Sequence, residues 1–179
     1  MKLKEPIVFI TGNMNKVHWT EKYIHVPMAH KKLDLTEIQS LDVKKVVEHK
    51  VKEAYKILGQ PVMVEDTSLT FHALGKLPGP FIKYFLEEIG NEGMCRMLKT
   101  NRSATAIVLF GIYDGKGLHF CEGRLEGTIA DKPRGEGGFG WDVIFIPQGY
   151  TKTYAEMSEK EMFEVSLRRL ALEKLKKII

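Results

Sequence analysis

Three short segments carry the residue types from which a nucleotide site is built. Segment 11–16, Thr-Gly-Asn-Met-Asn-Lys, offers small polar residues and a lysine directly after an apolar run. Segment 65–67, Glu-Asp-Thr, offers two neighbouring carboxylates, and segment 138–142, Gly-Phe-Gly-Trp-Asp, offers two aromatic rings and a third carboxylate. Hydrogen-bond donors for phosphate, acidic ligands for a metal ion and flat apolar surfaces for a base together suit a nucleoside triphosphate. We therefore expect a protein that handles nucleotides.

Segment 11–16 joins a predicted buried strand to a predicted helix whose N-cap is Asn13. The first amides of that helix, at Met14 and Asn15, have no partner inside the helix and lie at the positive end of its dipole. A helix start of this kind binds phosphate, and Lys16 adds a cation. The spacing is not that of a P-loop. A capped turn beside a solvated lysine is the alternative that the residues leave open.

Lys50 falls inside the apolar stripe of a helix predicted over residues 42–58. The stripe consists of Val43, Val46, Val47, Ala54 and Ile57. A lysine on such a face either extends along the surface to solvent or meets an anion, because a buried unpaired charge is costly. A polyphosphate would supply that anion, and both readings stay open.

Glu65 and Asp66 follow a strand predicted over residues 62–64, at its end. Adjacent strand residues point to opposite faces, so we expect only one of them to face a given site. A carboxylate there can ligate Mg²⁺, accept a proton from an attacking water, or simply bond the amides of a turn. Glu37 lies on a predicted loop, and nothing in its local pattern marks it as a metal ligand.

The glycines of segment 137–142 let a planar group approach the backbone closely, and the rings of Phe139 and Trp141 can stack on a base. Asp142 can accept hydrogen bonds from N–H groups of a ligand. A glycine-rich turn whose aromatic residues belong to the core explains the same residues without a ligand.

The elements that must position these residues follow from hydrophobic patterning and caps. Strands are predicted over residues 7–10, 32–35, 62–64, 104–113, 118–129 and 143–146. Helices are predicted over residues 13–25, 42–58, 81–88, 92–99 and 158–177. Helix and strand alternate first, and a hairpin with its turn at 114–117 follows, which favours an α/β fold with a mixed sheet. We expect a single domain over residues 1–179, because no repeat or linker interrupts the pattern.

Composition narrows the class of protein. With 44% hydrophobic and 28% charged residues, the 179-residue chain is typical of a soluble globular protein. Its net charge of +4 suits an anionic ligand but does not indicate nucleic acid. Cys95 and Cys121 lack metal-type spacing and are expected to be thiols. No signal peptide and no apolar run long enough for a bilayer is evident, so we expect a cytoplasmic protein with no membrane partner.

Taken together, the segments resemble the inosine triphosphate pyrophosphatase family. The matching motifs are Thr11-Gly12-Asn13 with Lys16, Glu65-Asp66-Thr67-Ser68-Leu69, Leu77-Pro78-Gly79-Pro80, Phe139-Gly140-Trp141-Asp142, Thr153-Tyr154-Ala155-Glu156-Met157, and Ser166 with Arg168. They occur in the family's order over nearly the whole chain. The resemblance implies a curved mixed sheet with helices forming two lobes around a nucleotide-binding cleft, and usually a homodimer. It also implies hydrolysis of ITP, XTP and dITP to the monophosphate and pyrophosphate.

The same resemblance implies roles for individual residues. Phosphates would be held by Thr11, Gly12, Asn13, Met14, Asn15, Lys16 and Lys50. Glu37 and Asp66 would hold Mg²⁺, and Asp66 would also activate the attacking water. Substrate would be contacted by Thr67, by Phe139 and Trp141 on the faces of the base with Gly140 between them, and by Asp142 and Arg168 near its polar edge.

Two positions depart from the family pattern. Leu167 stands where the family usually has a histidine that contacts the base, and Met162 stands where it has a lysine. A lost donor to the base weakens discrimination, so we expect relaxed or shifted base preference. Two alternatives remain: a nucleotide-binding protein of this fold that has lost catalysis, and a diphosphatase for another nucleotide, such as a modified pyrimidine triphosphate.

Overall fold

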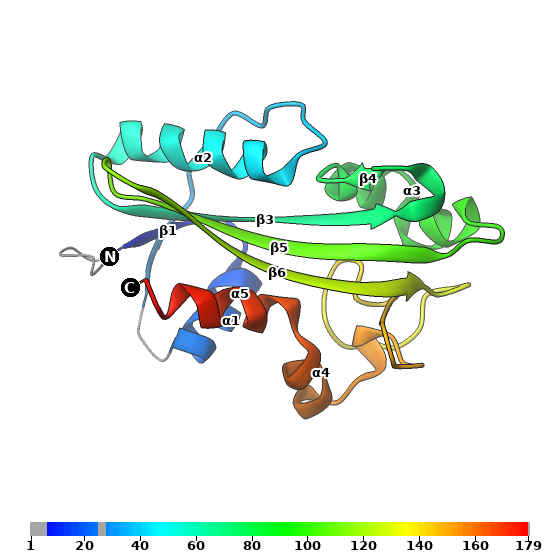
Figure 1. The fold of residues 1–179 in the computed structure, drawn as a ribbon. Helices are drawn as coiled ribbons and strands as arrows, with labels where there is room; N and C mark the ends of the chain where they lie inside the picture. Colours follow the sequence, from blue (N-terminus) through cyan, green and yellow to red (C-terminus); the bar gives the residue numbers. More distant parts are fainter. Residues whose placement is uncertain (1–6, 25–27, 179) are drawn as a thin grey trace. The chain divides into compact units, whose positions relative to one another are not determined.

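A computed structural model describes residues 7–24 and 28–178 (Figure 1). Within these residues the chain forms a mixed α/β fold, which confirms the predicted class. The strands are β1 (Val8–Ile10), β2 (Ala29–Lys31), β3 (Val62–Phe71), β4 (Pro78–Gly79), β5 (Ser103–Tyr113), β6 (Leu118–Ile129) and β7 (Phe145–Pro147). The helices are α1 (Met14–Ile24), α2 (Val43–Leu58), α3 (Ile82–Met97), α4 (Glu159–Val165) and α5 (Leu167–Leu175), with 3₁₀ turns η1 (His72–Leu74) and η2 (Tyr154–Glu156).

The strands form one sheet in the order β2-β1-β3-β5-β6-β7, and β4 pairs with β3 beside this path. β1 runs parallel to β2 and to β3, with Val8 opposite Ala29 on one side and Val62 on the other. β4 is antiparallel to β3, and β7 is antiparallel to β6. The predicted mixture of strand directions is therefore confirmed.

The chain divides into two compact units. Unit 1 comprises the described residues within 1–66, 108–123 and 168–179, and unit 2 comprises residues 67–107 and 124–167. The chain passes from one unit to the other inside β3, β5 and β6 and again at the start of α5 (Leu167–Leu175), so neither unit is a continuous stretch of sequence. A single domain over residues 1–179 and a cleft between two lobes stay predictions.

In unit 1 the strands lie between α2 on one side and α1 with α5 on the other (Figure 1). The apolar stripe of α2 packs so closely on β5 that a Cβ at Gly111 would lie 2.4 Å from a methyl group of Val47. Phe9 of β1 and Phe110 of β5 are fully buried, with ring centroids 6.1 Å apart. Within unit 1, residues 62–66 of β3 therefore have a different helical layer on each face.

The predicted limits of α2 are confirmed by both caps. The carboxylate of Asp42 accepts a hydrogen bond of 2.9 Å from the amide of Lys44, and Gly59 ends the helix with a left-handed φ of 65°. The apolar stripe was overestimated at its end, because Ile57 is 54% exposed. Similarly, α1 begins after Asn13 as predicted, and its predicted end at residue 25 lies outside the described residues.

Three strand predictions were wrong in their limits. The strand predicted over residues 32–35 corresponds to β2, which begins three residues earlier. The strand predicted over residues 143–146 corresponds to β7, which begins two residues later. β3 does not end at the carboxylates but continues to Phe71, so Glu65 and Asp66 lie in its middle. Carboxylates are usually unfavourable in a buried strand, because burying an unpaired charge is costly. Here each of them has cationic side chains as partners, which removes that penalty.

One helical prediction was wrong and another is confirmed. The final helix predicted over 158–177 is two helices, because Ser166 adopts an extended ψ of 119° between α4 and α5. The two helices predicted over 81–88 and 92–99 are confirmed, because Gly90 has a non-helical backbone, with φ of 65° and ψ of 179°, and divides α3 into two helical parts. Among the described residues, no helix has the length and apolar character needed to cross a membrane.

Both cysteines are buried free thiols, as predicted. Burial raises the pKa of the Cys121 thiol to about 11, and burial likewise raises the pKa of Cys95. At neutral pH both side chains therefore remain protonated and behave as small apolar groups in the core.

Arg102 of unit 2 ties the end of α3 to the end of β6. Its guanidinium donates hydrogen bonds to the carbonyl oxygens of Leu98 (2.5 Å), Cys95 (3.1 Å), Ile129 (2.6 Å) and Ala130. Arg102→Met removes all four of these hydrogen bonds, so we expect the free energy of unfolding to fall by about 2–4 kcal/mol in urea titrations.

Arg124→Met is the matched control, because Arg124 is exposed and pairs only at 3.3 Å with Glu126. Its loss is expected to stay below about 1 kcal/mol. Equal losses in the two variants would show that the Arg102 hydrogen bonds contribute little.

Candidate active site

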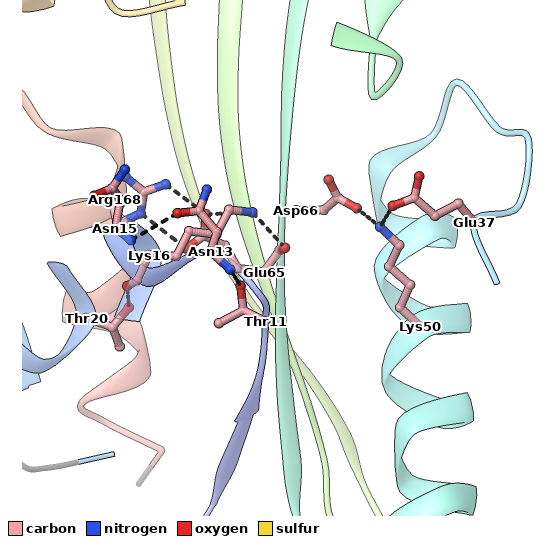
Figure 2. A network of polar contacts seen from close by, with 10 residues as sticks. All are labelled: Thr11, Asn13, Asn15, Lys16, Thr20, Glu37, Lys50, Glu65, Asp66 and Arg168. Atoms are coloured by element: carbon pink, nitrogen blue, oxygen red, sulfur yellow. Dashed lines mark hydrogen bonds and ion pairs between the residues drawn. The ribbon is translucent and has the colours of Figure 1, made fainter. Parts of the chain in front are cut away.

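The first candidate cluster lies on the α2 side of β3 and consists of Glu37, Lys50 and Asp66; we call it the α2-side cluster (Figure 2). The Nζ of Lys50 donates hydrogen bonds of 2.8 Å to Oε1 of Glu37 and 2.7 Å to Oδ2 of Asp66. The side chains of Lys50 and Asp66 are only 15% and 17% exposed. Lys50 therefore meets anions, which is one of the two alternatives that the sequence left open. Both of these anions are carboxylates of the protein.

Charge balance keeps Lys50 protonated in this cluster. Burial lowers its pKa, but the Asp66 carboxylate and, to a smaller extent, Glu37 outweigh burial, so the net pKa is raised above its usual 10.5. The ammonium thus occupies a position where two carboxylates jointly favour a cation.

A further acid, Glu53, binds the residue that precedes Glu37 and was missed in the sequence. Its carboxylate accepts hydrogen bonds of 2.8 Å from the amide and 3.0 Å from the hydroxyl of Thr36, the residue before Glu37. This contact anchors the loop between β2 and α2 to the helix that carries Lys50. The signal that could have identified Glu53 is its spacing of three residues from Lys50, which places both on one helix face.

The second candidate cluster lies on the opposite face of β3 and consists of Lys16, Glu65 and Arg168; we call it the α1-side cluster (Figure 2). Nη2 of Arg168 lies 2.8 Å from Oε1 of Glu65, and its Nε lies 3.1 Å from Oε2. Nζ of Lys16 lies 3.4 Å from Oε1 of Glu65 and donates a hydrogen bond of 3.2 Å to its carbonyl oxygen. Lys16 and Arg168 were predicted site residues, whereas the sequence left open how Glu65 and Asp66 divide their roles.

Glu65 is an ionised carboxylate with no solvent exposure of its side chain. Burial raises its pKa, but Arg168 and then Lys16 outweigh burial and hold the net pKa below its usual 4.5. The two neighbouring acids of β3 thus point to opposite faces, as the alternation of strand residues predicted. Only Asp66 belongs to the α2-side cluster.

The turn before α1 forms through local hydrogen bonds, as its residue types predict. The Thr11 hydroxyl accepts from the amide of Asn13 at 3.1 Å, and the Asn13 side chain accepts from the amide of Asn15 at 3.0 Å. The Thr20 hydroxyl donates to the carbonyl of Lys16 at 2.7 Å, one turn along the helix. Asn13 is therefore confirmed as the N-cap, and phosphate binding at segment 11–16 stays a prediction.

Unit 2 carries the aromatic residues of segment 138–142. Trp141 packs edge-on against Phe145, with ring centroids 5.6 Å apart, and is half-buried. The amide of Phe139 donates a 2.8 Å hydrogen bond to the buried carboxylate of Asp142. Gly138 has a left-handed φ of 71°, and a Cβ there would lie 2.4 Å from that carboxylate. Asp142 therefore shapes the turn that presents Phe139.

The turn is also joined to the motif at residues 153–157. The backbone of Ala155 donates to the carbonyl of Asp142 and accepts from the amide of Gly137, both at 3.1 Å. Asn91 of α3 donates to the carbonyl of Gly140 at 2.9 Å. Two motifs that are separate in the sequence thus form one folded unit. The contacts of Phe139, Gly140, Trp141, Asp142 and Thr67 with a substrate stay predictions.

Similarity to known proteins identifies the family of this chain. The sequence matches the Ham1 family over residues 7–178. This chain belongs to the Ham1 family. It is 45% identical over 177 residues to the inosine triphosphate pyrophosphatase of Yarrowia lipolytica, covering 95% of this chain and 93% of that protein. It is 37% identical over 175 residues to the dITP/XTP pyrophosphatase of Methanopyrus kandleri, covering 94% and 93%.

A solved Ham1 structure has the same fold. The HAM1 protein from Coxiella burnetii superposes with a TM-score of 0.84 at 26% sequence identity, over 96% of each chain. The family resemblance deduced from the motifs is therefore confirmed.

The α2-side cluster offers carboxylate oxygens as donors to a metal ion. Among the described residues no group of three or more His, Cys, Asp or Glu side chains is arranged to hold a metal ion. Glu37 and Asp66 nevertheless converge on one cationic nitrogen. Mg²⁺ is commonly bound by one or two carboxylates together with substrate phosphates, so this pair fits it.

The two departures from the family pattern lie on α4 and α5. Leu167 is the buried first residue of α5, directly before Arg168. Met162 is half-buried on α4, and Lys160, two residues earlier, is exposed. These positions offer apolar groups where the family pattern has a histidine and a lysine.

Proposed function

We propose that this chain hydrolyses non-standard purine nucleoside triphosphates, namely ITP, XTP and dITP, to the nucleoside monophosphate and pyrophosphate. Membership of the Ham1 family and the names of its relatives support the activity. The observation that carries the proposal is the convergence of Glu37 and Asp66 on the ammonium of Lys50. This cluster of two acids and one cation suits phosphoryl chemistry, and Lys16 and Arg168 add two further cations on the other face of β3.

In the proposed reaction, a water oxygen bonds to the α-phosphorus, and the bond from that phosphorus to the bridging oxygen breaks. Pyrophosphate leaves, and the carboxylate of Asp66 accepts the proton of the water. Lys16 and Lys50 stabilise the negative charge that develops on the phosphate oxygens. Mg²⁺ held by Glu37 and Asp66 would polarise those oxygens as a Lewis acid.

For the base, we propose that Phe139 and Trp141 flank its faces while Asp142 and Arg168 lie near its polar edge. Thr67 follows Asp66 in β3 and contacts the substrate, and residues 11–16 hold phosphates. Homodimerisation belongs to the same proposal and rests on the family resemblance, whereas a cytoplasmic location stays a prediction from the sequence.

A panel of nucleotides tests the function. Pyrophosphate and phosphate release would be measured with Mg²⁺ for ITP, XTP, dITP, ATP, GTP and dUTP. We expect pyrophosphate from the first three at higher kcat/KM than from the others, by a margin that the missing histidine at position 167 reduces. Pyrophosphate mainly from a different base would shift the substrate class, and binding of ITP without any pyrophosphate would indicate a binding protein without catalysis.

The buried apolar side chain of Leu167 favours reduced base discrimination and gives a specific prediction. Leu167→His is expected to raise the ratio of kcat/KM for ITP over ATP about tenfold, the effect of one additional hydrogen bond to the base. Leu167→Met, which adds no donor, is the control. A ratio that does not change in the histidine variant would exclude this position as a determinant of base preference.

A further inference from the structure

We propose that Glu65 is a positioning residue that holds Lys16 and Arg168 in the orientation from which they bind the nucleotide. The inference rests on the proposed function, because it assigns these two cations to the substrate. Glu65 itself is not a catalytic residue, since its side chain has no solvent exposure and therefore no access to a ligand.

One carboxylate orients both cations. The Nε and Nη2 atoms of Arg168 bind separate oxygens of Glu65, at 3.1 Å and 2.8 Å, which fixes the plane of the guanidinium. Lys16 bonds to the carbonyl oxygen of Glu65 at 3.2 Å and approaches Oε1 at 3.4 Å. Oε1 is thus shared between the two cations, which come from different helices.

In the α1-side cluster the cations lie nearer to solvent than the carboxylate. The cluster contains two cations and one carboxylate, and the cations are its more exposed members, at 18% for Lys16 and 12% for Arg168. An anion that approaches the cluster therefore meets the cations before it meets Glu65. Because the Glu65 carboxylate is buried, it orients the two cations without occupying the position of the ligand.

The positions of Lys16 and Arg168 in the fold explain why a residue that orients both of them is needed. Lys16 stands in the first turn of α1, Arg168 in the first turn of α5, and Glu65 is 103 residues from Arg168 in β3. Lysine and arginine have many rotamers, and ordering them at the moment of binding weakens affinity. Contacts that order them in the free protein strengthen it, so loss of Glu65 should act mainly on KM.

A double-mutant cycle separates positioning from general stability. Glu65→Gln is expected to raise KM for ITP about tenfold and to change kcat less than about threefold. Lys16→Met raises KM as well. In the double variant, the rise in KM should be at least about threefold smaller than the product of the two single effects, because Glu65 acts in part through Lys16. Glu173→Gln is the matched control, since it removes a carboxylate 2.7 Å from the neighbouring Arg169 on the same helix and should leave KM unchanged.

Multiplicative effects in the cycle, or an unchanged KM with only a lower melting temperature, would overturn the proposal. If Glu65→Gln does not fold, Glu65→Asp replaces it in the same cycle, because it keeps the charge and withdraws the carboxylate by one methylene. Pyrophosphate release by the unaltered protein is measured first and tests the proposed function separately. If that release is absent, the cycle is run on the dissociation constant for ITP, and absence of ITP binding overturns both proposals.

Discussion

Replacement of Asp66 by asparagine is expected to lower kcat for ITP by about 10²–10⁴-fold, the usual loss when a general base is removed. Asparagine has nearly the same shape but cannot accept the proton of the attacking water. It also reduces the negative charge at the site where Glu37 and Asp66 together favour a cation. The effect should appear in kcat in stopped or continuous assays of pyrophosphate release.

The fold should survive this change, because the Asp66 side chain is partly exposed and its amide replacement still accepts a hydrogen bond from Lys50. Asp114→Asn is the matched control. Asp114 accepts amide hydrogen bonds in the turn between β5 and β6, and asparagine can accept them equally. Turnover of the Asp66 variant within about threefold of the unaltered protein would remove Asp66 from the mechanism.

Removal of divalent cations with a chelator is expected to abolish pyrophosphate release, and Mg²⁺ should restore it. Glu37→Gln should raise the Mg²⁺ concentration for half-maximal activity at least about tenfold, since even the loss of an outer partner costs 10–100-fold in metal affinity. Calorimetric titration of Mg²⁺ in the presence of a non-hydrolysable ITP analogue gives a readout independent of turnover.

Glu48→Gln on α2 is the control for this experiment, because the side chain of Glu48 is 41% exposed and pairs with Lys52. Its Mg²⁺ requirement should equal that of the unaltered protein. Full activity in the presence of excess chelator, or an identical Mg²⁺ requirement in the Glu37 and Glu48 variants, would contradict the assignment of Glu37 to the metal.

Local chemistry allowed several parts of the fold to be predicted from sequence. Asp42 and Gly59 mark the ends of α2 because a cap depends on neighbouring residues only. Asp114 marks the β5–β6 turn for the same reason, and Ser158 with Glu161 forms the predicted capping box that begins α4. Inward placement of Lys50 followed from the spacing of the α2 stripe.

Contacts between distant segments were not predictable in this way. Arg168 reaches Glu65 across 103 residues, and this contact permits a carboxylate in the middle of β3, where the local pattern predicted a strand end. Glu37 could be named only through the family resemblance, because its partner Lys50 lies on another element. The break at Ser166, which separates α4 from α5, likewise had no local signal strong enough to override the helical pattern.

The most direct test of the central claim is hydrolysis of ITP in water labelled with oxygen-18, with mass analysis of both products. The proposed attack on the α-phosphorus predicts inosine monophosphate that carries one labelled oxygen, together with unlabelled pyrophosphate. Label in pyrophosphate, or release of phosphate in its place, would show attack at a different phosphorus and would contradict the proposed function.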